Sequence, residues 1–185
     1  MSKVAKILLI SSMFGHFAFE ALAPIYAIFV KNIGGDVLEA GAAYGIFMIV
    51  SGIFVFSLGQ TRFFLNNLRP MVVLGYGLLT VGEAGYFFVD SPFKLFILQA
   101  ILGAAIGILE PSWDGIYSAG LDEGRAASQW SLWAGSRNLV TGIAAFAGGA
   151  IVAVYSFTAL FAVMLIFNLV ALVIAFRILF DKMNK

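Results

Sequence analysis

The chain has 185 residues, of which 62% are hydrophobic and 11% are charged, with a formal net charge of +1 and a mean hydropathy of +1.00. A water-soluble domain of this length is nearer half apolar, so the composition excludes a soluble globular protein and indicates a polytopic membrane protein. The absence of cysteine excludes disulfides and cysteine-ligated metals, and the single histidine, His16, gives no basis for predicting a metal site.

Six apolar segments are each long enough to cross about 30 Å of hydrocarbon, which takes roughly 20 helical residues. They predict transmembrane helices over residues 7–30, 40–60, 70–89, 93–119, 126–154 and 157–180. Turn-forming residues separate the segments, as in Gly-Gly-Asp at 34–36 and Asp-Ser-Pro at 90–92. The first segment contains Glu20 and exceeds signal-peptide length, so we expect it to be retained. Because the apolar runs are continuous rather than alternating, the sequence predicts an all-α integral membrane protein whose residues 1–185 form a single six-helix transmembrane domain.

The basic residues indicate an orientation. Lys31 and Lys94 lie on one side of the predicted helices. Eight basic residues lie on the side shared by both termini, namely Lys3, Lys6, Arg62, Arg69, Arg125, Arg177, Lys182 and Lys185. Positively charged residues collect on the cytoplasmic side of membrane proteins. We therefore expect both termini in the cytoplasm and the protein in the plasma (inner) membrane.

Ionisable residues also lie inside the apolar segments. They are His16, Glu20, Glu83, Glu110, Asp114 and Arg137. Such residues cost several kcal/mol at membrane depth unless they face a protein interior or a water-filled cavity, so they mark paths for ions or substrate. Glu110 and Asp114 are four residues apart and share a helix face. Two carboxylates cannot both ionise cheaply at close range, so one of them is expected to hold a proton, as proton coupling requires.

The remaining buried charges leave alternatives open. His16 and Glu20 are also four residues apart, and either satisfy each other or line a site. Arg137 stays cationic and is expected to pair with a carboxylate of the fourth segment or with an anionic substrate, as a structural salt bridge or as a switch. Glu83 is a scaffold residue, a dimer contact or a proton relay. The excess of acidic over basic groups favours protons or cationic substrates.

Tryptophan and proline residues lie near these charges. Trp113 lies between Glu110 and Asp114, where an indole can stack on a sugar or hold an organic cation. Trp130, near the start of the fifth segment, is in the usual place of a membrane-interface anchor. Pro24 and Pro111 remove backbone hydrogen bonds within the spans and are expected to bend the first and fourth helices.

The connection between the second and third segments carries a family pattern. It reads Gly59-Gln60-Thr61-Arg62-Phe63-Phe64-Leu65-Asn66-Asn67-Leu68-Arg69-Pro70. This stretch resembles the Gly-x-Leu-Ala-Asp-Arg-x-Gly-Arg-Arg-Arg-Pro pattern of the major facilitator superfamily at both ends. By that resemblance Gly59 permits close helix approach and Arg69 marks the cytoplasmic face. Phe63 and Phe64 stand where the family has aspartate and arginine, so the family's charge relay lacks these two residues.

The resemblance extends over essentially the whole chain. The fourth segment reads Gln-Ala-Ile-Leu-Gly-Ala-Ala-Ile-Gly at 99–107, followed by Pro-Ser-Trp at 111–113. The fifth segment has Ala-Ala-Phe-Ala-Gly-Gly at 144–149, where exporters of the family carry Gly-Pro-x-x-Gly-Gly. Gly148 and Gly149 also fit the small-residue patterns by which membrane helices pack closely.

This resemblance implies one six-helix half of a transporter. Family members have two halves related by an axis along the membrane normal, with the substrate held between them. Two parallel copies of one chain can take those positions by two-fold symmetry, so we expect a homodimer with one central cavity lined by the first and fourth helices.

The expected function is secondary active, proton-coupled transport of a small organic solute by alternating access, without enzymatic activity. The solute is a sugar or an organic cation or drug. A non-transporting membrane scaffold, or one half of a hetero-oligomeric transporter, is the alternative. The expected partners are the lipid bilayer, a second copy of the chain, the solute and protons, whereas no cofactor, metal or nucleic acid is expected.

Overall fold

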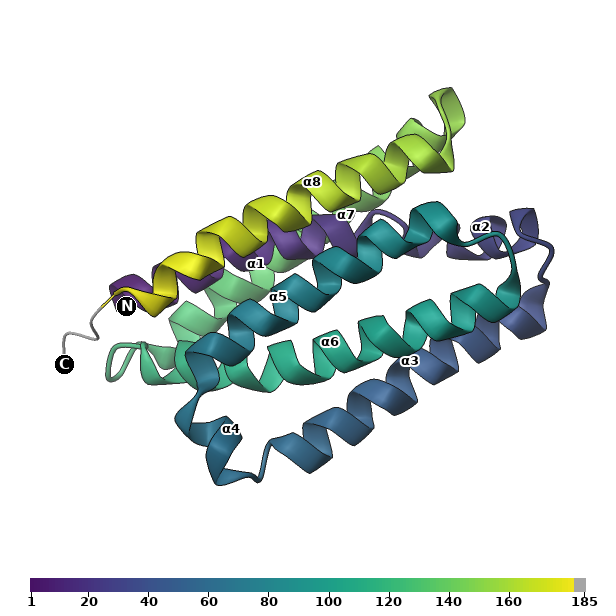
Figure 1. The fold of residues 1–185 in the computed structure, drawn as a ribbon. Coiled ribbons are helices and arrows are strands. Elements are labelled where there is room, and N and C mark those ends of the chain that lie inside the picture. The colour runs from purple at the N-terminus through teal and green to yellow at the C-terminus, as the bar shows by residue number, and fades with distance from the viewer. Residues whose placement is uncertain (182–185) are drawn as a thin grey trace.

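A computed structural model describes residues 1–181, and these residues form eight α-helices and three short 3-10 helices without a β-strand (Figure 1). The helices are α1 (Lys3–Glu20), η1 (Ala23–Ile25), α2 (Tyr26–Asn32), α3 (Val37–Leu58), α4 (Arg62–Asn66), α5 (Leu68–Gly85), η2 (Tyr86–Phe88), α6 (Pro92–Ala119), α7 (Ala126–Val154), α8 (Phe157–Phe176) and η3 (Arg177–Leu179). Together they make six spans long and apolar enough to cross a membrane. The predicted all-α, six-span architecture is confirmed. Lys182 and Lys185, counted above for the orientation, lie outside the described residues.

Helix caps account for the differences between predicted and observed boundaries. The second span begins at Val37 because the Asp36 carboxylate accepts the backbone N–H groups of Leu38 at 2.7 Å and of Glu39 at 3.4 Å, while the Glu39 carboxylate accepts the N–H of Asp36 at 2.9 Å. This reciprocal capping box starts a helix before the apolar run is established. The short helix α4 was not predicted, since it is a single turn started by the Thr61 hydroxyl, which accepts the N–H of Phe64 at 3.3 Å.

The two prolines act differently on their helices. Pro24 lies in the 3-10 segment η1, which separates α1 from α2, so the predicted break in the first span is confirmed. Helix α6 continues through Pro111 as a single α-helix of 28 residues. Next to it, the Ser112 hydroxyl donates to the carbonyl of Ile108 at 2.7 Å. Proline removes one helical N–H donor, and the dense packing around α6 holds the remaining turns in place.

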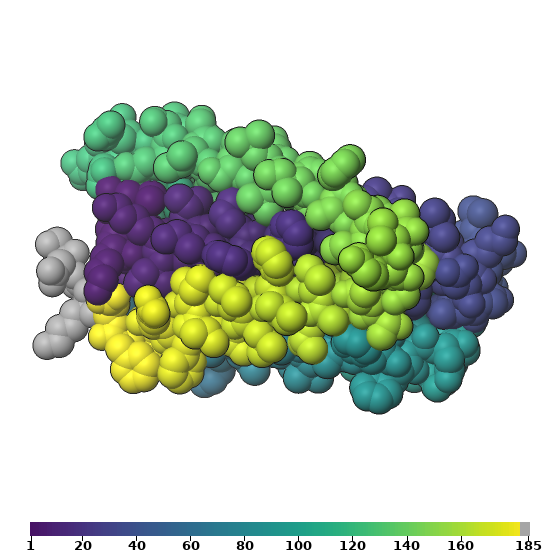
Figure 2. Space-filling model, turned by 90° about the horizontal axis from the view of Figure 1, so that it is seen from above, coloured from purple at the N-terminus to yellow at the C-terminus, as the bar shows by residue number. Residues whose placement is uncertain are grey.

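Helix α6 is the most buried helix of the fold. It packs against α3 and α5, while α1 packs against α7 and α8, and α5 against α8 joins the two groups. Figure 2 shows α1 lying between α7 and α8 on one face of the molecule. Glycines allow the closest approach, because a Cβ on Gly103 would collide with the carbonyl of Phe47 and one on Gly107 would lie 2.7 Å from the carbonyl of Ser51. Small residues let helix backbones approach in lipid, where the hydrophobic effect does not drive helices together.

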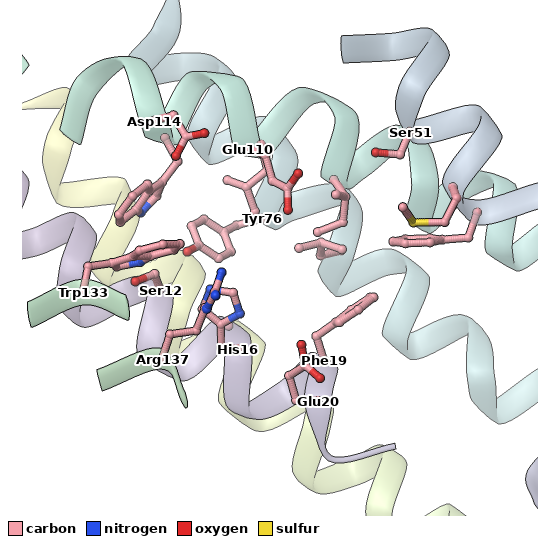
Figure 3. A pocket seen from close by; sticks show the side chains of 17 residues that line it. Ser12, His16, Phe19, Glu20, Ser51, Tyr76, Glu110, Asp114, Trp133 and Arg137 are labelled. Carbon is pink, nitrogen blue, oxygen red and sulfur yellow. The ribbon is translucent and has the colours of Figure 1, made fainter. Parts of the chain in front are cut away.

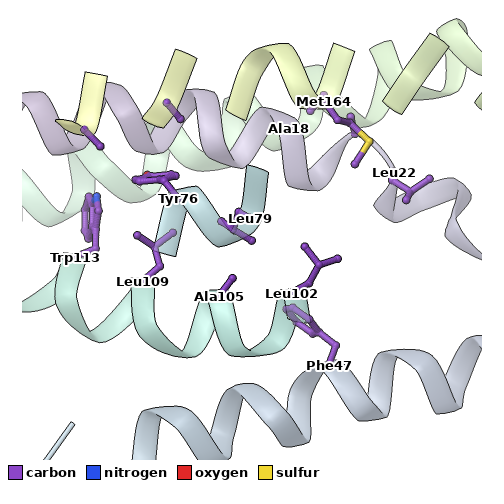
Figure 4. Close-up of a cluster of buried hydrophobic side chains, with 14 of the residues drawn as sticks. Ala18, Leu22, Phe47, Tyr76, Leu79, Leu102, Ala105, Leu109, Trp113 and Met164 are labelled. Atoms are coloured by element: carbon purple, nitrogen blue, oxygen red, sulfur yellow. The ribbon is translucent and has the colours of Figure 1, made fainter. Parts of the chain in front are cut away.

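A buried apolar cluster holds the two helix groups together (Figure 4). Leu102 and Leu109 of α6 face Leu79 of α5, and Met164 extends the cluster to α8. Phe47 reaches it from α3 and is only 6% exposed. Three of these residues, Phe47, Leu79 and Leu109, also form part of the apolar wall of the cavity described below.

The start of α1 and Asp181, which are the two ends of the described part of the chain, lie at one end of the bundle (Figure 1). Lys3 forms an ion pair with Asp181 at 2.8 Å, and Arg69 donates to the backbone carbonyl of Asp181 at 2.6 Å. The N-terminal ammonium of Met1 bonds the Asp122 carboxylate, and together with the amide of Gln129 it holds the pKa of Asp122 below its usual range. Arg69 therefore ties the start of α5 to the end of α8 at the end that carries the termini.

Candidate functional site

A cavity of about 390 Å³ lies in the middle of the bundle and is lined by α1, α3, α5, α6 and α7 (Figure 3). Its polar wall contains most of the ionisable residues of the spans. These lining residues are His16, Glu20, Glu110, Asp114 and Arg137. The cavity also borders the aromatic rings of Tyr76, Trp113 and Trp133. The structure thus gathers six of the seven predicted solute and proton residues at one place.

Helical spacing places these groups. His16 and Glu20 lie one turn apart on α1, Glu110 and Asp114 one turn apart on α6, and each pair faces the cavity. Arg137 is the corresponding charge on α7 and follows Trp133 by four residues. In Figure 3, the Glu110 carboxylate points into the space across from His16 and Arg137.

Arg137 is held by an aromatic ring. Its guanidinium carbon lies 4.6 Å from the centroid of the Trp133 ring, a cation–π geometry. Among residues 1–181 it forms no ion pair within 4 Å, so the expected direct pairing with a carboxylate of α6 is not made. Glu20 and Glu110 line the same cavity as Arg137. The guanidinium is therefore positioned by Trp133 and keeps its donors free toward the cavity.

His16 and Glu20 are not bonded to each other. No hydrogen bond or ion pair joins them in the part of the chain that the structure describes. Instead, the centroid of the His16 ring lies 6.2 Å from the centroid of the Trp133 ring. Of the two readings of this pair, the structure supports residues that line a site, because both face the cavity without satisfying each other.

An aromatic cluster closes the end of the cavity nearest the termini. The Trp113 ring stacks on Tyr117 at 4.5 Å between ring centroids and contacts Trp133 at 5.3 Å. Its indole N–H donates to the carbonyl of Leu8 at 3.3 Å, which fixes the ring against α1. The ring centroids of Trp130 and Tyr117 lie 5.0 Å apart, so Trp130 packs into this cluster, although its position in the sequence is typical of a membrane anchor. The cluster joins the start of α7 to α6.

Trp133 lines the cavity, but the sequence did not predict it as a site residue. Its indole nitrogen is buried without a hydrogen-bond partner in the described residues, and the ring lines the cavity. It therefore offers an unused donor beside Arg137. The four-residue spacing between Trp133 and Arg137 was an available signal, because it places both side chains on one face of α7. Ser12, which also lines the cavity, lies four residues before His16 and so carried the same kind of signal, whereas Tyr76 had none.

Glu83 lies elsewhere. It is 2% exposed on α5 and lines a separate cavity of about 140 Å³, adjoining the first one. Glu83, for which a scaffold role, a dimer contact and a proton relay were the alternatives, is thus the predicted solute or proton residue that does not line the central cavity. Within the central cavity, the carboxyl groups of Glu20, Glu110 and Asp114 outnumber the single guanidinium of Arg137. Such a site attracts cations and protons.

The glycines that were expected to assist packing take different positions. A Cβ on Gly148 would collide with the backbone of Ala21, so Gly148 lets α7 approach the end of α1. Gly149 has no heavy atom within 4 Å of such a Cβ and faces open space. Gly59 ends α3, and the atoms near it belong to Val55 of the same helix, so it does not provide the close helix approach that was expected. Gly103 and Gly107 provide that approach instead, because they sit where α6 crosses α3.

Comparison with known proteins identifies the family. A family model described as Major Facilitator Superfamily matches residues 8–184, whereas a search of curated proteins finds no match. Members of this superfamily are generally membrane transporters rather than enzymes, and six long apolar helices make this chain a multi-pass membrane protein. The match covers nearly all of the chain, including every helix that lines the cavity. The chain therefore belongs to the Major Facilitator Superfamily, of which it forms a six-helix, half-size domain.

Proposed function

We propose that the chain is a half-size subunit of a secondary active transporter that moves a small organic cation across the plasma (inner) membrane, coupled to protons. The observation that carries the proposal is the central cavity, where three carboxyl groups and one guanidinium meet inside an apolar bundle. Ionisable groups at membrane depth are rare and mark functional sites, among them substrate and ion pathways and proton relays. The excess of carboxyl groups favours an organic cation over a sugar as the solute.

Glu110 and Asp114 are the proposed coupling pair. Both line the cavity one helical turn apart, and their charges are of the same sign. Mutual repulsion favours a proton on one of them while the cavity is empty. A cationic solute or a change of access can then displace that proton. Alternating access follows from rocking of the two walls around a site at the midplane.

A parallel homodimer supplies the second wall. The faces of α3 and α7 are poorly covered, since only Ala144 and Gly148 are buried in α7 and only Ala43, Phe47 and Ser51 in α3. Six glycines on these two helices have no heavy atom within 4 Å of an added Cβ, namely Gly41, Gly45, Gly52, Gly135, Gly142 and Gly149. Stripes of this kind pack against other helices in membranes.

A polar residue on the same surface also favours a protein partner over lipid. Asn138 is exposed near the middle of α7, where an amide facing hydrocarbon is costly. A two-fold axis along the membrane normal places α3 of one copy against α7 of the other and closes the cavity between them. The basic residues at the end that carries the termini support a cytoplasmic location of that end.

Leucine at open glycines should separate the two copies. Gly45→Leu and Gly142→Leu fill space that is empty within one chain, so each variant should fold and yet run as a monomer in mild detergent. Gly77→Leu is the matched control, because Gly77 is equally open but lies on α5 beside Leu172 and Phe176 of α8. Mass measurement by light scattering distinguishes the forms. A control variant that dissociates as readily as the others would place the interface elsewhere.

Uptake into liposomes tests the function itself. Purified protein is reconstituted with an imposed pH gradient, and a panel of organic cations and sugars is screened for accumulation. Accumulation that collapses with a protonophore supports proton-coupled transport. If no solute moves and the gradient does not decay through the protein, the chain acts as a scaffold or needs a different partner half, and the proposal fails.

A further inference from the structure

The second cavity contains a buried carboxyl group without a partner. It lies toward the end of the bundle away from the termini and has a volume of about 140 Å³. Glu83 lines it from α5 and is 2% exposed, and its Oε2 atom has no hydrogen-bond partner among residues 1–181. No cationic side chain of the described residues lies within ion-pair distance of Glu83. A buried carboxylate in this state needs a cation or a proton from outside the chain.

The one side-chain amide of this cavity wall is already bonded to two tyrosines. The Gln99 side-chain amide donates to the hydroxyl of Tyr26 at 2.9 Å and to the hydroxyl of Tyr86 at 3.2 Å. Both of its N–H donors are therefore used, and neither is available to Glu83. These two bonds tie α2, η2 and α6 together. The hydroxyls of Tyr26 and Tyr86 accept them, and neither hydroxyl forms a hydrogen bond with Glu83 in the part of the chain that the structure describes.

The rest of the cavity wall is aromatic and apolar. Phe19, Tyr44, Phe47 and Tyr86 all contribute to it. Aromatic rings around a carboxylate suit a quaternary ammonium group, which the ring faces attract and which needs no hydrogen-bond acceptors. The volume sets the size of the occupant, since a cavity of about 150 Å³ holds a molecule the size of benzene.

Two aromatic residues separate this cavity from the central one. Phe19 and Phe47 line both cavities, and their ring centroids lie 5.5 Å apart. A molecule in the Glu83 cavity is thus one aromatic pair away from Glu20 and Glu110. The two cavities form consecutive compartments rather than one site.

We propose that the Glu83 cavity is a second binding site, which takes a small methylated ammonium ion with Glu83 as its counter-ion and the aromatic rings as its walls. The site holds the cation on the far side of the Phe19–Phe47 pair from the central carboxylates. Binding there is an equilibrium property of the folded chain. It does not depend on the proposed transport, so either can fail without the other.

Carbodiimide labelling tests the site at the level of one residue. Dicyclohexylcarbodiimide adds to carboxyl groups in apolar surroundings, and peptide mass spectrometry locates the adduct. In the full chain in detergent, Glu83 should be labelled, and tetramethylammonium should slow that labelling at least about tenfold. tert-Butanol, which has a similar shape without the charge, should not protect Glu83. Labelling without protection by tetramethylammonium would mean that Glu83 carries only a proton, and equal protection by tert-butanol would mean that charge is not recognised; either result overturns the proposal.

A direct binding measurement gives the second readout. Equilibrium dialysis with radiolabelled tetramethylammonium should show the affinity of one site falling at least about tenfold in Glu83→Gln, with partial recovery in Glu83→Asp. Glu123→Gln should leave this site unchanged, because Glu123 is exposed in the turn between α6 and α7 and lines neither cavity. Unchanged binding in a folded Glu83→Gln protein contradicts the proposal. Should that variant not fold, the labelling of the unmodified chain decides alone.

Discussion

Replacing Glu110 with glutamine should abolish solute accumulation driven by a pH gradient while solute exchange down its own gradient continues. The amide keeps the shape of the side chain and most of its hydrogen bonding but cannot carry a proton. Glu110 faces the cavity with Asp114 one turn away, so loss of its proton removes the coupling step and leaves the path open. Proteoliposomes with the solute on one side measure both activities, and the variant should bring internal and external concentrations to equality.

Two further variants make this result specific. Asp114→Asn should weaken solute binding, because a cation then loses one of the carboxylates of the cavity. Glu123→Gln is the control, since Glu123 is exposed in the turn between α6 and α7. This variant should accumulate solute like the parent protein. If Glu110→Gln and Asp114→Asn both accumulate solute normally, the pair is structural. Coupling would then have to be sought at Glu20 with His16, or at Glu83.

Arg137→Met should lower the rate of uptake at least about tenfold without unfolding the bundle. Arg137 is the one cation among the lining residues, and its place over Trp133 leaves its donors free toward the carboxyl groups. Without it, the acidic groups lose the charge that balances them, and the empty cavity binds protons or solute cations without releasing them readily. Initial rates of uptake at several solute concentrations measure the effect, and thermal unfolding shows that the fold is retained.

The comparison with lysine separates charge from geometry. Arg137→Lys keeps the positive charge but loses the flat guanidinium that stacks on an indole, so its uptake should fall between those of the parent and of Arg137→Met. Arg177→Met serves as the control for loss of a basic residue, because Arg177 is exposed at the end of α8. Equal rates in all these proteins would show that Arg137 has no part in transport.

Local properties of the chain account for what could be predicted. Long apolar runs require helices in a membrane, because each backbone N–H and C=O must be satisfied within its own segment. The six spans, their turns and the break at Pro24 follow from this rule. The four-residue spacings on the first and fourth spans likewise place His16 with Glu20, and Glu110 with Asp114, on single helix faces.

The rotation and spacing of the helices depend on contacts between distant segments. Gly103 and Gly107 bring α6 against α3 and turn Glu110 and Asp114 toward α1, whereas Gly148 brings α7 against Ala21. A long apolar helix has almost no preferred face of its own, so hydropathy does not indicate which side meets a neighbour.

The contact of Arg137 with Trp133 follows from their spacing within α7, but only the tertiary structure showed that no carboxylate of α6 lies within ion-pair distance of Arg137 in the described residues. It likewise separated Glu83 into a compartment of its own. Both arrangements result from the packing of helices that are far apart in the chain. The sequence identified the charged groups, and the helix contacts determined which of them share a cavity.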